Sequence, residues 1–287
     1  MTYLAAAIIV VVVLTLYFYS TSLTHPNQWK AAIIDQLSSS KLDEIIRHEN
    51  QTFLEAAKES LYKRFSTVDY FSDNATVEEY KRLPYANYKL IVWRAHSALD
   101  LDSKYVAIST TDKYGSKSYD QYLNSEQLTL CNITGDANLY KMYFGITPKF
   151  IKEVMNGRFE DTIIIFMSCN GLKNGYHETA NAFEERGVKV FISWDGWVSF
   201  FDNDNAVTLL LQYLVGENDT VSAAVDKIPA YLSDFGWTKL RYDPNNTEAA
   251  DYRLPNYKEN GIAMNTSPMT LTIFRKIENH LRSSLQN

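Results

Sequence analysis

Two almost uninterrupted apolar runs constrain this fold more than any other feature of the sequence. One reads YKLIVWRA at 88–95, and the other reads DTIIIFMS at 161–168. Such a run is typical of a strand that is buried on both faces of a parallel sheet. A third run, VKVFIS at 188–193, follows the second after a predicted helix at 178–186. Because buried strands alternate with helices, the sequence favours an α/β domain with a mainly parallel sheet and helices on both faces.

The rest of the chain divides around this α/β pattern. Shorter strands are predicted at 68–71, 106–109, 127–132 and 270–274, and further helices at 77–83, 147–155, 204–215, 220–232 and 275–285. Ahead of them, apolar residues at helical spacing predict two more helices, at 29–37 and 41–65. We therefore expect a helical spacer over 23–65 and one α/β domain over 66–287, which is long enough to bury a sizeable core.

The first 22 residues form a separate region. Residues 1–24 contain no charged side chain, and the stretch from Leu4 to Tyr19 is almost wholly apolar. About 20 such residues are enough to cross a bilayer as a helix. The alternative is a cleaved signal peptide, which usually begins with positive charge, and no Lys or Arg precedes Lys30. We expect an uncleaved transmembrane helix over 1–22, with a cleaved signal as the alternative.

Charge and glycosylation sequons bear on the surroundings of the domain. The formal net charge is −6, whereas a nucleic-acid-binding face is basic, so no nucleic-acid partner is expected. Asn-x-Ser/Thr sequons, the acceptors of N-glycosylation, begin at six positions: Asn50, Asn74, Asn132, Asn218, Asn245 and Asn265. A chain rich in Asn and Thr also forms sequons by chance. We expect a single-pass membrane glycoprotein whose domain faces outside the cell, or a secreted protein if the first segment is cleaved.

Two residues at the ends of the long apolar runs suggest chemistry. His96 follows the first run, and Cys169 follows the second. Neighbouring parallel strands would bring both to the carboxyl edge of the sheet, where α/β domains place their sites. A cysteine attacks as its thiolate, and a nearby imidazole can take the thiol proton. A turn at Asn170 and Gly171 would direct backbone N–H groups at a developing oxyanion. The spacing alone is a weak signal, and Cys131 is expected to be a free, buried cysteine.

Three stretches of the chain carry a family resemblance. VDYFSDNATVEEYKRLPYANYKLIVWRAHS, at 68–97, has a strand, a Thr-initiated helix and a buried strand that leads to a His. ITPKFIKEVMNGRFEDTIIIFMSCNG, at 146–171, has a Thr-Pro-initiated helix and a hydrophobic strand that ends in a small residue and a Cys. Together with 179–225, these stretches resemble caspase-like cysteine peptidase domains of the CHAT, gingipain and clostripain type, over about 66–228.

The resemblance implies roles for three residues. Cys169 matches the nucleophile and His96 the catalytic histidine. In these families the Cys and the residue after the His supply the oxyanion-hole N–H groups, which here would be those of Cys169 and Ser97. A glycine is usual at the position of Ser97, and a positive φ there would strain a serine. Clostripain-like relatives carry an acidic residue two positions before the Cys, where this chain has Met167, so a preference for Arg or Lys does not carry over.

The loop after the third apolar run offers candidates for a substrate pocket: Trp194, Asp195, Trp197, Asp202 and Asp204. A carboxylate in that loop would bind a basic side chain of a substrate. The alternative is that the three aspartates are solvated or cap the helix that follows, and that the two tryptophans fill the edge of the sheet. No metal-ligand spacing is present, and neither a metal nor a cofactor is expected.

These observations favour a membrane-tethered, outward-facing cysteine peptidase that cleaves protein or peptide substrates with a Cys169/His96 dyad. The main alternative is a catalytically inactive caspase-like domain that acts as a binding or assembly module at the cell surface. A third possibility is a glycosylated structural surface domain without a site.

Overall fold

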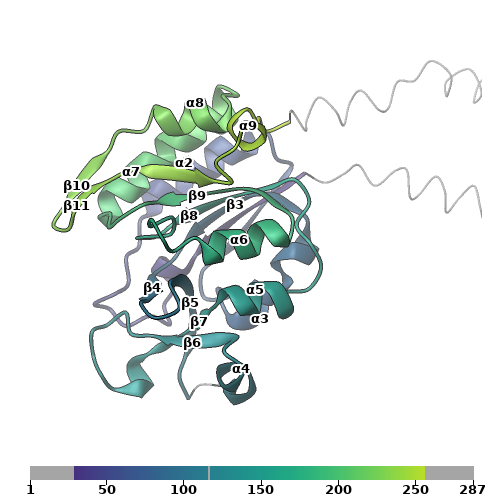
Figure 1. Cartoon of the computed structure of the whole chain (residues 1–287). Helices are drawn as coiled ribbons and strands as arrows, with labels where there is room; N and C mark the ends of the chain where they lie inside the picture. Colours follow the sequence, from purple (N-terminus) through teal and green to yellow (C-terminus); the bar gives the residue numbers. More distant parts are fainter. Residues whose placement is uncertain (1–28, 116, 256–287) are drawn as a thin grey trace, which may run out of the picture. The chain divides into compact units, whose positions relative to one another are not determined.

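The computed structural model describes residues 29–115 and 117–255, which fold around a six-stranded sheet in the order β12-β9-β8-β3-β1-β2 (Figure 1). Its strands are β1 (Lys30–Asp35), β2 (Thr67–Phe71), β3 (Tyr88–Arg94), β8 (Thr162–Met167), β9 (Val188–Trp194) and β12 (Leu240–Asp243). The first five are parallel to one another, and β12 runs antiparallel beside β9. The predicted α/β class with a mainly parallel sheet is confirmed.

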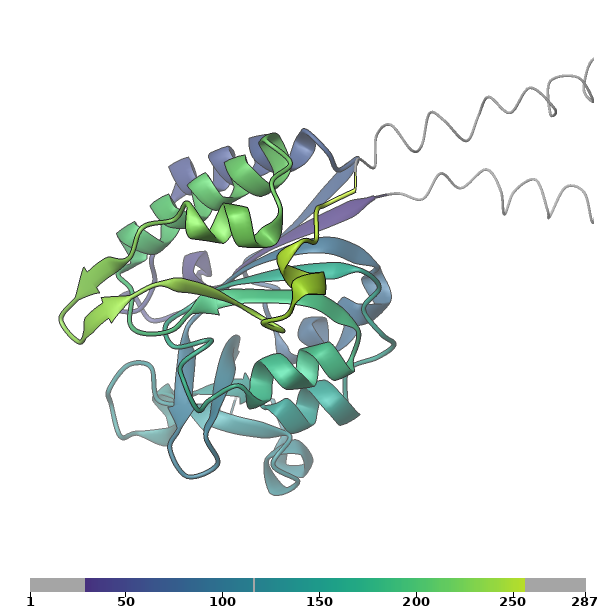
Figure 2. The same ribbon diagram turned by 45° about the horizontal axis from the view of Figure 1, so that its top comes forward.

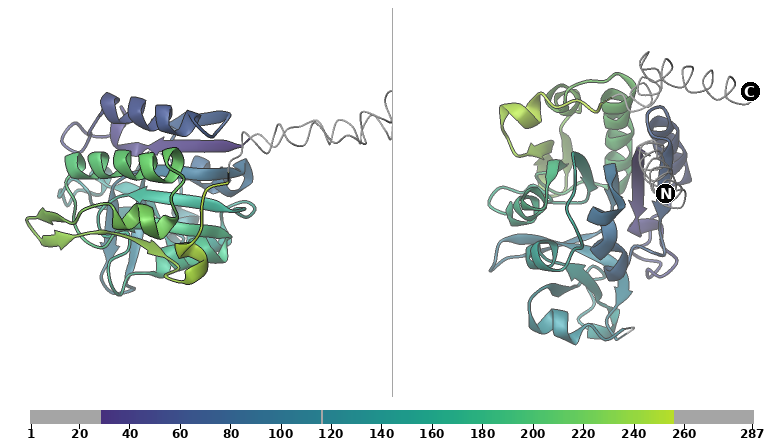
Figure 3. Two further views of the ribbon diagram at one scale, coloured as in Figure 1. Left: turned by 90° about the horizontal axis from the view of Figure 1, so that it is seen from above. Right: turned by 90° about the vertical axis from the view of Figure 1, so that its right-hand side faces the viewer.

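Helices cover both faces of this sheet, as predicted (Figures 1 and 2). One face carries α2 (Gln51–Tyr62), α7 (Phe200–Leu211) and α8 (Val221–Asp226), and the other carries α3 (Val77–Arg82), α5 (Pro148–Glu153) and α6 (Glu178–Glu185). Seen from above, α2 and α7 lie side by side over the sheet (Figure 3). Several helices begin where a side-chain oxygen accepts a backbone N–H of the first turn, at Asn50, Thr76, Thr147, Ser199 and Thr220.

None of the helices within the two described ranges is long and apolar enough to span a membrane. The apolar segment 1–22, the predicted strand at 270–274 and the predicted helix at 275–285 all lie outside the described residues.

The predicted helix at 29–37 is wrong. Residues Lys30–Asp35 form β1, which is paired on both sides, with β2 and β3, and is buried at every position after Lys30. A short apolar run cannot be assigned to a strand or a helix by periodicity alone, and here long-range pairing decides. The helix predicted over 41–65 is present only as α2, and a loop occupies 39–49. Residues 30–62 therefore belong to the α/β domain and do not form a spacer ahead of it.

A second sheet was not expected from the sequence. It has four antiparallel strands in the order β4-β5-β7-β6, which are Ser97–Asp100, Tyr105–Lys113, Tyr143–Ile146 and Leu128–Cys131. After α8, where a continuing helix was predicted to 232, the chain forms a hairpin of β10 (Tyr231–Ser233) and β11 (Gly236–Thr238). The other two α-helices in the described ranges are α4 (Asp120–Asn124) and α9 (Thr247–Ala250).

The core is densest around β3, whose seven residues are all buried. Trp93 is fully enclosed, with its ring edge-to-face against Tyr80 of α3 at 4.6 Å and Phe183 of α6 at 5.9 Å. Such aromatic pairs add roughly 0.5–1.5 kcal/mol beyond their buried area. This packing fixes the strand that leads directly to His96.

The order of the strands indicates where in the sheet a ligand site is expected. β1 lies between β2 and β3, so the connection from β1 to β2 through α2 and the connection from β2 to β3 through α3 run in opposite directions along the sheet. The two connections use opposite faces of the sheet. In open α/β sheets, ligands bind at such a reversal, outside the carboxyl ends of the strands. The carboxyl ends of β1, β3 and β8 meet at this edge.

Candidate functional site

The ends of β3 and β8 bring His96 and Cys169 next to each other. The two strands pair in parallel with Arg94 opposite Met167, and His96 and Cys169 each lie two residues further along. The hydroxyl of Ser97 donates a hydrogen bond of 2.8 Å to the carbonyl oxygen of Cys169. The expected adjacency of the two strand ends is therefore confirmed.

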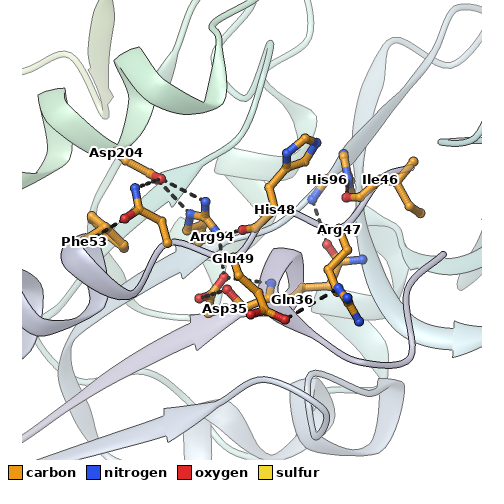
Figure 4. Close-up of polar contacts among 12 residues, drawn as sticks. Asp35, Gln36, Ile46, Arg47, His48, Glu49, Phe53, Arg94, His96 and Asp204 are labelled. Carbon is orange, nitrogen blue, oxygen red and sulfur yellow. Dashed lines mark hydrogen bonds and ion pairs between the residues drawn. The ribbon is translucent and has the colours of Figure 1, made fainter. Parts of the chain in front are cut away.

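The imidazole of His96 is held by a backbone carbonyl (Figure 4). Its Nε2 lies 2.8 Å from the carbonyl oxygen of Ile46, in the loop between β1 and α2. A carbonyl can only accept a hydrogen bond, so Nε2 carries the proton and Nδ1 of the neutral ring keeps a lone pair. The backbone N–H of His96 donates to Oε1 of Gln36 at 3.0 Å, and Phe200 lies edge-on to the ring with centroids 5.7 Å apart.

Burial lowers the pKa of His96 to about 4, from an ordinary value of 6.5. The hydrogen bond to Ile46 opposes this shift, whereas the charges of His48 and Arg94 reinforce it. Burial disfavours the charged form of a histidine because the imidazolium loses its hydration. The ring is therefore neutral at pH 7, so one of its two nitrogens keeps a lone pair.

The thiol of Cys169 is partly buried and contacts the backbone of Val198. The N–H of Val198 lies 3.5 Å from Sγ, and its carbonyl oxygen lies at the same distance. Burial raises the pKa of the Cys169 thiol, and the Val198 N–H moderates that rise. The pair is thus a thiol and a neutral imidazole, and between these two described side chains there is no direct hydrogen bond.

The second cysteine is separate from this site. Cys131 is fully buried in β6, and burial raises its thiol pKa to about 12. Both cysteines are free, which confirms the prediction that they form no disulfide with each other.

The turn after Cys169 differs from the expectation that its N–H groups face an oxyanion. The N–H of Asn170 donates to the carbonyl of Gly196 at 2.8 Å, and Asn170 takes a left-handed φ of 60°. A Cβ added at Gly171 would lie 2.0 Å from Oγ of Ser193. The turn therefore docks tightly onto the end of β9, and the N–H of Asn170 is already used there.

Ser97 is free of the strain expected for a residue in place of glycine. It is not among the described residues with a positive φ. The N–H of Ser109 donates to the carbonyl of His96 at 3.0 Å, and Ser97 lies opposite Ile108. In an antiparallel ladder this makes Ser97 and Ile108 a non-hydrogen-bonded pair. The N–H of Ser97 therefore points away from β5.

Two of the three candidate pocket aspartates hold structural elements together. Asp195 accepts the N–H of Lys239 at 2.8 Å and the guanidinium of Arg241 at 2.9 Å, which ties the end of β9 to β12. At the start of α7 the Ser199 hydroxyl accepts the N–H of Asp202 at 3.1 Å and donates to the Asp202 carboxylate at 2.7 Å. Both carboxylates therefore have partners within the chain.

The third aspartate, Asp204, is buried in an ion pair with Arg94. The Nε and Nη2 atoms of Arg94 donate to its two carboxylate oxygens at 2.7 and 2.9 Å. Nη1 of the same guanidinium donates to Asp35 at 2.9 Å (Figure 4). Asp204 is 4% exposed, so it offers no free carboxylate to a ligand, contrary to the expectation that it lines a pocket.

The two tryptophans of the same segment have different surroundings. Trp194 is fully buried, and its Nε1 donates to Asn203 at 2.9 Å, so it fills the interior and does not wall an open pocket. Trp197 is 45% exposed and lies against Phe235, with ring centroids 4.9 Å apart.

The glycosylation sequons also differ in their surroundings. Three of their asparagines are exposed: Asn74, Asn132 and Asn245. Asn50 instead caps α2 and donates to Asp204 at 2.9 Å, and Asn218 accepts from Arg64 at 2.8 Å. Asn265 lies outside the described residues.

Sequence reasoning missed most of the groups that surround the two site residues. Gln36 and Ile46 lie in two segments that were predicted to be helices. Ile46 and Val198 act through backbone atoms, and a residue's type does not show what its backbone atoms contact. Arg94 did carry a signal. A charged residue inside a fully buried strand needs a buried partner, and the partners are Asp35 and Asp204.

Comparison with known proteins adds no relative. No protein-family model matches this chain, and no curated protein matches it. Within 29–115 and 117–255, no group of three or more His, Cys, Asp or Glu side chains is arranged to hold a metal ion.

Proposed function

We propose that this chain is a caspase-like cysteine peptidase in which Cys169 is the nucleophile and His96 the general base. The observation that carries the proposal is the orientation of His96. Its Nε2 is bound to the Ile46 carbonyl, which leaves Nδ1 as the basic atom at the carboxyl edge of the sheet. A nucleophile, a base and a third group that orients the base are the parts that covalent catalysis by cysteine requires.

The geometry supports a simple sequence of steps. Nδ1 of His96 takes the Sγ proton of Cys169 as Sγ turns from Val198 and attacks the carbonyl carbon of a peptide bond. The oxyanion of the tetrahedral intermediate accepts hydrogen bonds from the N–H groups of Ser97 and Cys169. The intermediate collapses, the C–N bond breaks, and His96 gives its proton to the leaving amine. A water molecule, deprotonated by His96, then hydrolyses the thioester and regenerates the thiol.

The proposed substrates are peptides or proteins without a required basic side chain. Asp195, Asp202 and Asp204 all have partners within the chain, and Met167 is buried. None of them offers an unpaired carboxylate that would select Arg or Lys. This proposal replaces the preference for basic residues considered from the sequence.

Labelling and turnover of the full-length protein test the proposal. Iodoacetamide should modify Cys169, and Cys169→Ala should abolish both this modification and the cleavage of fluorogenic peptides that carry Arg, Leu or Asp before the cleaved bond. His96→Gln should lower the cleavage rate by about 10²–10⁴-fold. Cys131→Ala is the matched control, because that thiol is fully buried, and it should change neither readout. Cleavage that survives Cys169→Ala would rule out this nucleophile.

A second candidate function is a binding or assembly module without catalysis. It is favoured by the two contacts of Sγ with Val198, which satisfy the thiol within the protein. The same experiment separates the two functions. The binding module would be supported by two results together. Iodoacetamide would modify Cys169 equally fast in the wild type and in His96→Gln, and no peptide would be cleaved.

The proposed location is the outer face of the cell membrane, with 1–22 as the anchor, or the exterior of the cell if that segment is cleaved. It is supported by the apolar character of 1–22 and by the three exposed sequons. The described chain begins at the amino end of β1, whereas His96 and Cys169 lie at the carboxyl ends of the strands. An anchor ahead of β1 would therefore join the domain at the edge opposite the site.

A further inference from the structure

The loop over 39–49, between β1 and α2, carries the carbonyl of Ile46 that binds His96, so its position sets the orientation of the ring. A loop carbonyl orients a base well only if the loop is itself held in place. One anchor of the loop is a backbone hydrogen bond, and another is an ion pair that is partly exposed to solvent. The N–H of His48 donates to the carbonyl of Leu37 at 2.8 Å, and Asp43 forms a half-exposed ion pair with Lys113.

One buried anchor of this loop is the packing of Leu42 and Ile46 against Tyr143, and the buried charged anchor is the guanidinium of Arg94 (Figure 4). Its Nη1 donates to the carbonyl of His48 at 2.7 Å, two residues beyond Ile46, and also to Asp35 at the end of β1. Its Nε and Nη2 form the bidentate pair with Asp204 of α7. Arg94 is 1% exposed. One side chain thus joins the end of β1, the loop and α7.

The same guanidinium is also connected to a second neighbour of the imidazole, Phe200. Asp204 lies one turn along α7 from Phe200, whose ring is edge-on to His96 and is stacked on His48 at 3.7 Å. Asp204 further accepts from Asn50, the residue that caps α2 directly after the loop. Both contacts that hold the His96 ring, through Ile46 and through Phe200, therefore lead back to Arg94.

We propose that Arg94, with Asp35 and Asp204, is a positioning residue that holds His96 in its Nε2–H tautomer with Nδ1 directed to the reacting atoms. The expected effect of Arg94 on cleavage rests on the proposed peptidase function, whereas its effect on the tautomer of His96 does not. A buried ion cluster is an inefficient way to stabilise a fold, because apolar side chains of similar volume often serve as well. An arginine is suited to this role because its planar fork fixes several acceptors at once, which a lysine cannot do.

Three variants of the full-length protein test this inference. Asp204→Asn removes one charge at nearly constant shape, and Arg94→Lys keeps the positive charge but loses the fork. The triple variant Arg94→Met, Asp35→Asn, Asp204→Asn leaves no buried charge unpaired, and so it keeps the test valid if a single variant fails to fold. Asp112→Asn is the matched control. Asp112 is a buried carboxylate, 5% exposed, that accepts the N–H of Val77 in α3 and is paired with Lys117, not with Arg94.

The first readout is the tautomer of His96, from the ¹⁵N chemical shifts of its ring at pH 7. The wild type and Asp112→Asn should show Nε2–H alone, and the three cluster variants should show a mixture of tautomers. The second readout is kcat/KM for peptide cleavage, which should fall on the order of 10²-fold in the cluster variants, as expected for a misplaced catalytic group. A purely structural role would lower the thermal midpoint and leave the tautomer unchanged.

The outcomes separate this inference from the proposed function. Folded cluster variants that keep a single Nε2–H tautomer and cleave within twofold of the wild-type rate would overturn the positioning role. If Arg94→Lys shows the wild-type tautomer and the wild-type kcat/KM, the planar fork of the guanidinium is not required, and its role is overturned. If the wild type cleaves no peptide, the proposed function fails, and the tautomer measurement still decides whether Arg94 positions His96.

Discussion

The protonation of His96 links the site to the stability of the fold. The folded ring has a pKa of about 4, against an ordinary value of 6.5. Between these values the unfolded chain binds a proton at His96 and the folded chain does not. The free energy of unfolding therefore falls as the pH drops through this window. Each pKa unit is worth about 1.36 kcal/mol, so the loss at His96 is on the order of 3 kcal/mol once the pH reaches about 4.

This pH dependence can be measured by urea denaturation of the wild type and of His96→Gln, whose amide can still donate to Ile46. Between pH 7 and pH 4 the wild type should lose roughly 3 kcal/mol more than the variant. Between pH 7 and pH 8, where His96 is neutral in both the folded and the unfolded chain, the two proteins should respond to pH alike. Parallel curves throughout the acidic range would show that the folded ring titrates normally.

The start of helix α7 shows how a local signal positions a distant site. The Ser199 hydroxyl accepts the N–H of Asp202 and donates to its carboxylate, and the first turn places Phe200 against His96. Ser199→Ala should lower the free energy of unfolding by about 1 kcal/mol, because an N–H of the first turn loses its acceptor. Ser199→Gly should lower the free energy of unfolding by only about a few tenths of a kcal/mol. Chemical denaturation of the wild type, Ser199→Ala and Ser199→Gly measures these differences. Equal stability of Ser199→Ala and the wild type would contradict the capping role of Ser199.

Across the whole molecule, the surface decides which sequons are open to modification. Asn74, Asn132 and Asn245 are exposed, whereas the amide nitrogen of Asn50 donates to buried Asp204. If the full-length protein enters the secretory pathway of a eukaryotic host, peptide mapping by mass spectrometry should find glycans at the three exposed asparagines and none at Asn50. Asn50 serves as the internal control. A fully glycosylated Asn50 would contradict the fold around Asp204, and no glycan at any site would contradict the proposed outside location.

The parts of this protein that could be predicted from its sequence have local or periodic causes. Strands β3 and β8 are buried on both faces, so almost every residue in them is apolar, and the α/β class follows from their alternation with helices. The same runs place His96 and Cys169 at one edge of the sheet, because parallel strands end at one edge, and the pairing of β3 with β8 makes the two strand ends neighbours. Helix α5 begins at Thr147 and Pro148, where the capping residues predict it.

The parts that could not be predicted depend on partners far away in the chain. The residues of β1 form an apolar run too short to distinguish a strand from a helix, and pairing with β2 and β3 decides between them. The role of Asp204 depends on Arg94, which lies 110 residues earlier. The acceptor for His96 is the backbone carbonyl of Ile46. Every residue has such a carbonyl, and only the path of the chain in space brings this one to the imidazole.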